Sequence, residues 1–139
     1  PTKLPFGMGF YKQGPLLKLR LPNGRELSYV KPRIDDDSIT YEGTIQSSGG
    51  WGRIESYGPK LVENIVQATA RDCLAVAIDR LERAGFPVVF HVHDEVICEV
   101  PIGVSSAEEI NQIMSAPIEW AKGLPLRADA YECEYYRKD

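Results

Sequence analysis

Residues 87–100 constrain the fold more than any other stretch of the chain. Two apolar, β-branched runs flank a short polar break in this segment, His93-Asp94-Glu95. Runs this short and this β-branched are typical of buried strands rather than of a helix. Because the break leaves room only for a tight turn, the segment is predicted to form a β-hairpin. The tip carries an imidazole and two carboxylates, which suit Mg²⁺, although Asp is also a common turn residue.

Length, composition and charge set broad limits. The chain has 139 residues, enough for one domain with a core, and its 43% hydrophobic and 26% charged content is ordinary for a globular protein. The net charge of −4 argues against a free-standing nucleic-acid clamp but leaves room for a local basic surface. Three widely spaced cysteines predict neither a disulfide framework nor a zinc site, so a reducing cytosol is the default location. The sequence shows no signal peptide and no apolar run of membrane-spanning length, so no membrane partner is predicted.

The first half of the sequence predicts antiparallel β structure. Residues 1–14 hold two Pro and three Gly without a period, which indicates an irregular lead-in. Strands are expected at 16–21 and 25–30 around the turn Pro22-Asn23-Gly24, and then at 39–46 and 51–57. The acidic run at 35–37 is interpreted as an exposed loop. Five basic residues of the first hairpin suit a solvated face or phosphate contact equally well: Lys18, Arg20, Arg25, Lys31 and Arg33.

Residues 59–84 are predicted to form one long helix. Pro59 fits the first helical position and Gly85 the end. Spacings of three and four predict one buried apolar face, made of Val62, Val66, Ala70, Cys73, Ala77, Leu81 and Ala84. A second stripe consists of hydrogen-bond donors: Lys60, Asn64, Gln67 and Arg71. Such a row suits the acceptors that the DNA minor groove presents on every base pair, although a solvated helix face is the more common situation.

The last third of the sequence predicts two short helices and a strand. Ser105 and Glu108 match a capping box for a helix over 106–115, and residues 117–122 predict a short helical turn that carries Trp120. A final strand is expected at 126–136. The predicted fold class is therefore α+β, an antiparallel β-sheet that includes the 87–100 hairpin, with the long helix packed on one face through Val66, Ala70, Cys73 and Ala77.

Two segments together carry a resemblance to a known family. They are Tyr57-Gly58-Pro59-Lys60, continued by Glu63, Asn64, Gln67 and Arg71, and Val92-His93-Asp94-Glu95-Val96. This combination resembles the C-terminal palm of family A, polymerase I-like DNA polymerases, and the phage-type branch is the most similar. The resemblance includes the segments 51–53, 117–125 and 136–138, so that it covers most of the chain from about Leu16 onward.

The resemblance implies roles for the residues at the hairpin tip and on the helix. Asp94 would be one of two aspartates that hold a pair of Mg²⁺ ions for nucleotidyl transfer, with Glu95 in a supporting role and His93 near the primer terminus. Gln67 would donate into the minor groove at the newest base pairs, with Arg71, Asn64 and Lys60 as neighbouring DNA contacts. The implied partners are primer-template DNA and deoxynucleoside triphosphates, in the cytoplasm of a bacterial or phage-infected cell.

The chain departs from the family pattern in two respects. Pro59 stands where the family has a second glycine. The sequence also lacks the motif of the other catalytic aspartate and the fingers helix that grips the incoming nucleotide, both of which precede this region in the family. We therefore expect residues 1–139 to be the C-terminal part of a palm domain, a fragment that is inactive alone.

Three other interpretations remain open at this point. A single-subunit RNA polymerase usually has His-Asp-Ser at the hairpin tip, and Glu95 argues against it. A non-catalytic nucleic-acid-binding or scaffold module could keep the palm and lose catalysis. A metal-dependent hydrolase would need a second carboxylate cluster, for which Asp72 or Asp129 are candidates without support from their spacing.

Overall fold

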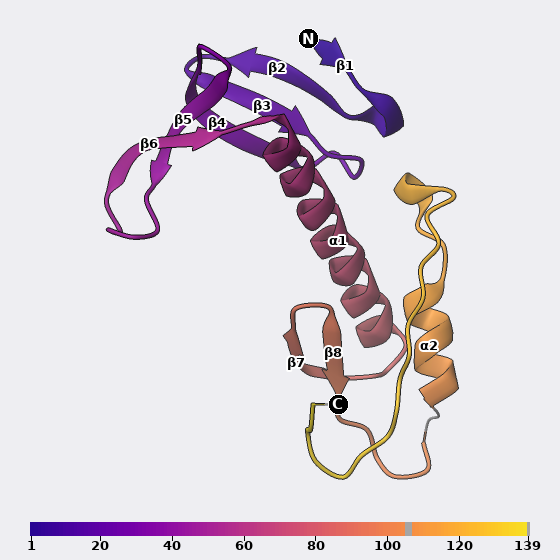
Figure 1. Cartoon of the computed structure of the whole chain (residues 1–139). Helices are drawn as coiled ribbons and strands as arrows, with labels where there is room; N and C mark the ends of the chain where they lie inside the picture. Colours follow the sequence, from indigo (N-terminus) through magenta and orange to yellow (C-terminus); the bar gives the residue numbers. More distant parts are fainter. Residues whose placement is uncertain (105–106, 139) are drawn as a thin grey trace. The chain divides into compact units, whose positions relative to one another are not determined.

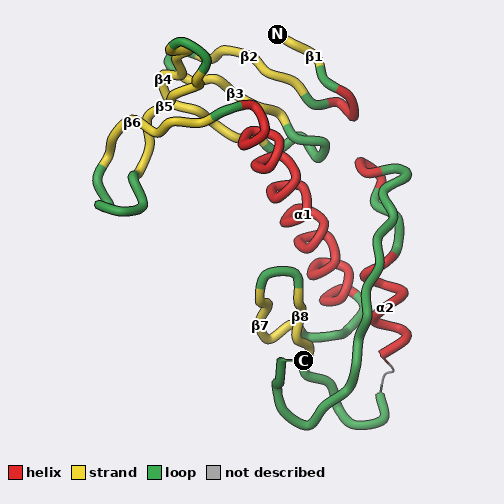
Figure 2. The backbone as a smooth tube through the Cα atoms, in the orientation of Figure 1, coloured by secondary structure: helices red, strands yellow, loops and turns green. Residues whose placement is uncertain are grey.

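The computed structural model describes residues 1–104 and 107–138. Over these residues the fold is α+β, as predicted: antiparallel strands accompany one long helix and one short helix (Figure 1, Figure 2). The chain divides into two compact units, Pro1–Thr69 and Ala70–Asp139. The long helix α1, Gly58–Arg83, contributes residues to both units.

The first unit contains a six-stranded antiparallel sheet whose strands follow one another in chain order. Short connections between consecutive strands give this meander directly, because each turn returns the chain beside the strand just formed. The strands are β1 (Thr2–Lys3), β2 (Gly9–Gln13), β3 (Leu16–Arg20), β4 (Glu26–Asp35), β5 (Ser38–Thr44) and β6 (Trp51–Ser56). A single 3₁₀ turn, η1 (Pro5–Gly7), joins β1 to β2.

The hairpins predicted in this half are confirmed. Residues 21–25 connect β3 to β4, with Gly24 at φ 89° and the side-chain oxygen of Asn23 accepting from the Arg25 N–H at 2.9 Å. Leu19 lies opposite Leu27 in the ladder, and Leu19, Leu21 and Tyr29 are buried. The acidic run ends β4 and forms the turn to β5, where all three carboxylates are exposed as expected.

The prediction of an irregular lead-in over residues 1–14 is wrong. Residues 9–13 form β2, which pairs along its whole length with β3 and places Phe10 opposite Leu19. Pairing with a neighbouring strand overrides the missing local pattern, because strand formation depends more on its partners than on intrinsic propensity. Gly9 is required here, since a Cβ at this position would lie 2.8 Å from the Thr2 carbonyl oxygen.

Glu42 on β5 joins three side chains of the sheet and should make its stability depend on pH. It accepts from Trp51 Nε1 at 3.3 Å and pairs with Lys31 at 3.2 Å and Arg53 at 3.7 Å. The hydrogen bond from Trp51, followed by that from Lys31, lowers the pKa of Glu42 below its ordinary value of 4.5.

A carboxylate with a lowered folded pKa stabilises the fold above its unfolded pKa and loses that effect as pH falls. We therefore expect acidification from about pH 6 to about pH 3.5 to reduce the free energy of unfolding less in Glu42→Gln than in the wild type. Urea denaturation at both pH values measures this, and equal losses in the two proteins would contradict it.

The helix α1 begins at Gly58 and ends at Arg83, each one residue before the predicted bounds, and Gly85 follows as its cap, as expected. Gly85 has φ 87°, and its N–H donates to the Glu82 carbonyl while the Phe86 N–H donates to Leu81. These two bonds form a Schellman cap, which needs a left-handed residue at the position of Gly85.

The predicted apolar face of α1 is correct only in the second half of the helix. Ala77 and Leu81 are buried, but Val62 and Val66 are 58% and 61% exposed, and Ala70 and Ala84 are also exposed. In the first half, the partly buried apolar side chains are instead those of Leu61, Ile65 and Ala68. The side chain of Asn64 and the carbonyl of Ala68 bond to the sheet, through Tyr29 and Arg25, and these bonds fix which side of α1 faces the strands. The apolar periodicity predicted the helix correctly. Contacts between residues distant in sequence determine its rotation about its own axis relative to the sheet.

In the second unit, β7 (Val88–Val92) and β8 (Glu95–Cys98) form the predicted hairpin. Among the described residues they form a sheet of their own, so the prediction that this hairpin belongs to the main sheet is wrong. The interpretation as buried strands is also wrong, since Val89 and Phe90 are 50% and 41% exposed. A tight turn and cross-strand pairing suffice to form a hairpin, but covering its faces needs further elements.

The rest of the second unit contains α2 (Ala107–Ser115) and the short turn η2 (Glu119–Ala121), which carries Trp120 as predicted. The proposed cap Ser105 and the first predicted helical residue Ser106 lie outside the described residues. The predicted strand at 126–136 is absent and the segment is irregular. In place of a strand ladder, the Ala128 N–H donates to Ser115 Oγ at 3.0 Å.

Arg80 ties α1 to the segment that follows α2. Its guanidinium donates to the carbonyls of Ala116 and Pro117 at 2.8 and 2.7 Å. Apolar side chains of α1 and of the segments after it form the buried core of this unit: Leu74, Ala77, Leu81, Phe86 and Ile118. Over residues 1–104 and 107–138, no helix combines the length and apolar character needed to cross a bilayer.

Candidate functional site

The tip of the β7–β8 hairpin is a two-residue turn. Val92 and Glu95 form the last ladder pair, so His93 and Asp94 make up the turn. His93 has φ 52°, a left-handed conformation that is uncommon outside glycine but is visited by His more often than by most residues. The side chains of His93, Asp94 and Glu95 are all exposed. The predicted catalytic residues therefore lie together at the tip of the hairpin, His93 and Asp94 in the turn and Glu95 at the start of β8, and the Asp94 side chain is exposed.

The carboxylates of Asp94 and Glu95 are suitable ligands for a hard cation, but two residues are too few for a complete metal site. Carboxylate oxygens are the ligands that Mg²⁺ prefers, and an exposed turn leaves room for its bound water and for substrate phosphates. Within the described parts of the chain, no group of three or more His, Cys, Asp or Glu side chains could hold a metal ion. Asp94 and Glu95 therefore fit a Mg²⁺ site in which other groups supply the remaining ligands. The described residues give no support to the alternative of a metal-dependent hydrolase with its own complete metal site.

The two faces of the hairpin contact different parts of the chain. Phe90, Val92 and Glu95 share one face, because successive side chains of a strand alternate and ladder partners point the same way. His91 lies on the other face, where its ring nitrogens are 3.3 and 3.4 Å from the two terminal nitrogens of Arg71. Arg71, predicted to contact DNA, is thus held beside β7 by a residue that the sequence analysis did not single out.

Tyr136 covers the face of the hairpin that Glu95 occupies. Its ring packs edge-to-face against Phe90, with centroids 5.0 Å apart, and its hydroxyl donates to Glu95 Oε2 at 3.3 Å. Desolvation and the nearby Glu95 charge raise the pKa of Tyr136 above its ordinary value of 10.0. Tyr136 therefore remains a protonated donor at neutral pH.

The other predicted DNA-binding residues lie on the part of α1 that belongs to the first unit. Lys60 and Gln67 are exposed and both bond to Glu63, at 2.9 and 3.1 Å. The hydrogen bond from Lys60 to Glu63 raises the pKa of that lysine. Asn64 is turned toward the sheet and donates to the Tyr29 hydroxyl at 3.1 Å. Glu63 was predictable from its spacing of three and four residues, at which helix side chains meet.

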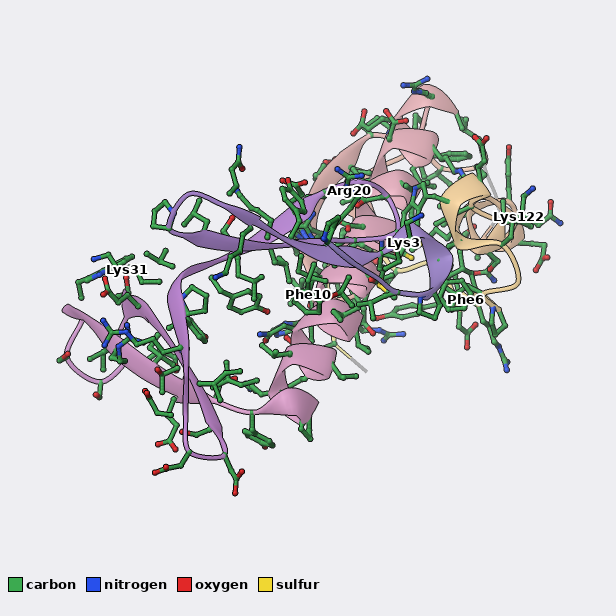
Figure 3. The ribbon with its side chains drawn as sticks, turned by 90° about the horizontal axis from the view of Figure 1, so that it is seen from above. Lys3, Phe6, Phe10, Arg20, Lys31 and Lys122 are labelled. Atoms are coloured by element: carbon green, nitrogen blue, oxygen red, sulfur yellow. The ribbon has the colours of Figure 1, made fainter. Side chains whose placement is uncertain are left out.

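Most basic residues of the first hairpin bond within the sheet or to α1. Lys18 donates to Ser28, Arg20 pairs with Glu26 at 3.7 Å, and Arg25 reaches the Ala68 carbonyl at 3.2 Å. Figure 3 shows Arg20 and Lys31 at separate positions on the sheet. These contacts are those of a solvated outer face, and phosphate contact at this hairpin gains no support from them.

Comparison with known proteins gives one significant match. The whole chain aligns, over 145 residues and with 50% identity, with a region of a protein named DNA polymerase from Bacillus phage SP02. The chain spans 22% of the length of that relative. No protein-family model matches the sequence, and no solved structure matches it. The chain is thus similar, from end to end, to one region of a phage DNA polymerase.

Proposed function

We propose that this chain is the C-terminal part of the palm of a phage-type, family A DNA polymerase and that it takes part in template-directed primer extension. The observation that carries the proposal is the 50% identity, over the whole chain, to a region of a phage DNA polymerase. The exposed Asp94 and Glu95 at the tip of a two-residue turn agree with the role that the resemblance implies for them.

In this proposal Asp94 is a metal ligand and the hairpin is its support. Asp94 would hold two Mg²⁺ ions together with oxygens from the rest of the polymerase and from the substrates. When bound, Mg²⁺ stabilises negative charge on a transferring phosphoryl group and lowers the pKa of an attacking hydroxyl. The two-residue turn carries Asp94 at the end of the hairpin, with Glu95 at the adjacent ladder position. In this proposal Glu95 would support Asp94, and His93 would lie near the primer terminus.

The proposed substrates are primer-template DNA and deoxynucleoside triphosphates, in the cytoplasm of a bacterial or phage-infected cell. Gln67 and Lys60 are the exposed donors of α1 best suited to the duplex, since their partner Glu63 is exposed too and water or DNA can replace it. Asn64 already donates to the buried Tyr29 and would contribute less, whereas Arg71 and its partner His91 are both exposed.

Gln67→Ala tests the proposed contact with DNA in a full-length polymerase that contains this chain. Loss of one hydrogen bond to the minor groove should weaken primer-template use about fivefold, or about 1 kcal/mol. The effect should depend little on the terminal base pair, because minor-groove acceptors are nearly the same on every pair. Primer-extension kinetics on primers with each of the four terminal base pairs measure both expectations.

Gln112→Ala is the matched control for this experiment. Gln112 is also exposed on a helix and also donates to the glutamate four residues earlier, Glu108, at 3.4 Å. It should leave primer extension unchanged. Equal effects of the two variants, or a Gln67→Ala effect confined to one terminal base pair, would contradict the assignment. DNA binding without any nucleotide incorporation by the full-length protein would favour a non-catalytic nucleic-acid-binding module instead.

A further inference from the structure

The C-terminal segment bonds to both strands of the hairpin that carries Asp94. Tyr136 packs its ring on Phe90 of β7 and donates its hydroxyl to Glu95 of β8. Figure 1 shows this segment ending beside the hairpin, within the same unit. One side chain from the end of the chain thus joins the two strands on the face that Glu95 shares with Phe90.

The loop that presents Tyr136 is closed on itself. The Tyr131 hydroxyl donates to the Arg137 carbonyl at 2.6 Å, and the Arg137 guanidinium lies 6.0 Å from the centre of the Tyr131 ring. Arg137 directly follows Tyr136, so these contacts hold the backbone on the C-terminal side of Tyr136. A side chain on a loop fixed in this way loses less conformational entropy when it bonds to Glu95 than one on a free tail would.

An exposed glutamate without a fixed partner samples several rotamers, and ordering it costs conformational entropy. The bond from Tyr136 engages Oε2, one of the two carboxylate oxygens of Glu95. Glu95 directly follows Asp94 in the chain. A Glu95 carboxylate held in one orientation therefore places its negative charge at a fixed position beside Asp94.

We propose that Tyr136 is a positioning residue, which orients the Glu95 carboxylate beside Asp94 through its hydroxyl and braces the hairpin through its ring. The inference rests on the proposed function of the hairpin tip. It assigns to the C-terminal loop a direct role in the arrangement of the site, in addition to its packing.

Tyr136→Phe tests the hydroxyl alone, because it keeps the ring contact with Phe90. In a full-length polymerase that contains this chain, the variant should lower kcat about fivefold, the equivalent of one lost hydrogen bond at an exposed site. KM for the nucleotide, DNA affinity and the melting temperature should not change. Tyr135→Phe is the matched control, since Tyr135 is the adjacent tyrosine and is 71% exposed, and it should behave as the wild type. An unchanged kcat in Tyr136→Phe, or a parallel loss in Tyr135→Phe, would overturn the proposal.

A double-mutant cycle tests whether Tyr136 acts through Glu95. In a Glu95→Ala background, Tyr136→Phe should cause no further loss of kcat, because the group that it positions is gone. Additive losses would show that Tyr136 acts elsewhere and would overturn the proposal. Asp94→Ala separates this inference from the proposed function. If Asp94→Ala is inactive while Tyr136→Phe is normal, only the positioning role fails; normal synthesis by Asp94→Ala would remove the proposed site itself.

Discussion

Asp94→Ala, in a full-length polymerase that contains this chain, is expected to abolish primer extension and to leave DNA binding nearly unchanged. Removing a group that stabilises charge in the transition state commonly costs about 10²–10³ in rate, and a carboxylate that holds two metal ions should cost at least the upper end. DNA affinity should persist, because the proposed DNA contacts come from α1 and lie outside the hairpin turn. Single-turnover nucleotide incorporation and a primer-template binding titration measure the two quantities separately.

Asp37→Ala is a closely matched control for this experiment. Asp37 is the second residue of another exposed two-residue turn, between the ladder partners Asp35 and Ser38, and the residue before it, Asp36, has φ 53° where His93 has φ 52°. Asp37→Ala should therefore leave incorporation unchanged. The 139-residue chain alone should incorporate no nucleotide, since Asp94 and Glu95 give Mg²⁺ too few protein ligands. Near-normal synthesis by Asp94→Ala would reduce the hairpin tip to an ordinary turn.

The likeness of these two turns shows what backbone geometry can and cannot assign. Both place an aspartate at the second position of a two-residue turn after a residue with positive φ. Asp94 differs in its neighbours, because Glu95 follows it and Tyr136 bonds to that glutamate. The choice of Asp94 as the metal ligand therefore rests on the resemblance and on these neighbours.

Local signals predicted much of the fold correctly. Apolar runs separated by Pro22-Asn23-Gly24 and by His93-Asp94-Glu95 predicted two hairpins, and three- and four-residue spacing with the cap at Gly85 predicted α1. Each of these features depends on residues close together in the chain. Turn chemistry and helix caps act over a few residues, so they can be read without knowing the rest of the fold.

Features set by distant contacts were missed. The strand at 9–13 forms because β3 is available beside it, while 126–136 has alternating apolar residues but is irregular in the structure. The pairs Arg71–His91 and Glu95–Tyr136 are separated by 20 and 41 residues, and no spacing rule connects them. The sequence therefore predicted the hairpin tip that carries the candidate site. It did not predict the side chains that contact the site residues, His91 and Tyr136.

Leu81→Ala is expected to have the largest effect on stability among single substitutions in the second unit. Leu81 is 0% exposed, and its carbonyl accepts the Phe86 N–H in the cap that ends α1. Removing three buried carbons leaves a cavity that the neighbouring side chains fill only in part, and such changes cost about 2–5 kcal/mol. Because small domains are stable by about 5–15 kcal/mol, this loss is a large share of the total.

Each unit contains one tryptophan, which allows the effect of Leu81→Ala to be localised. Trp51 belongs to the first unit and Trp120 to the second, so fluorescence of a Trp51→Phe background follows the unit that contains Leu81. Urea denaturation in this background should show the 2–5 kcal/mol loss as a lower transition midpoint. Val66→Ala removes an aliphatic side chain of the same helix that is 61% exposed, and it should change the free energy of unfolding by less than about 0.5 kcal/mol. Equal losses in the two variants would show that Val66, as the sequence pattern alone predicts, is covered in solution.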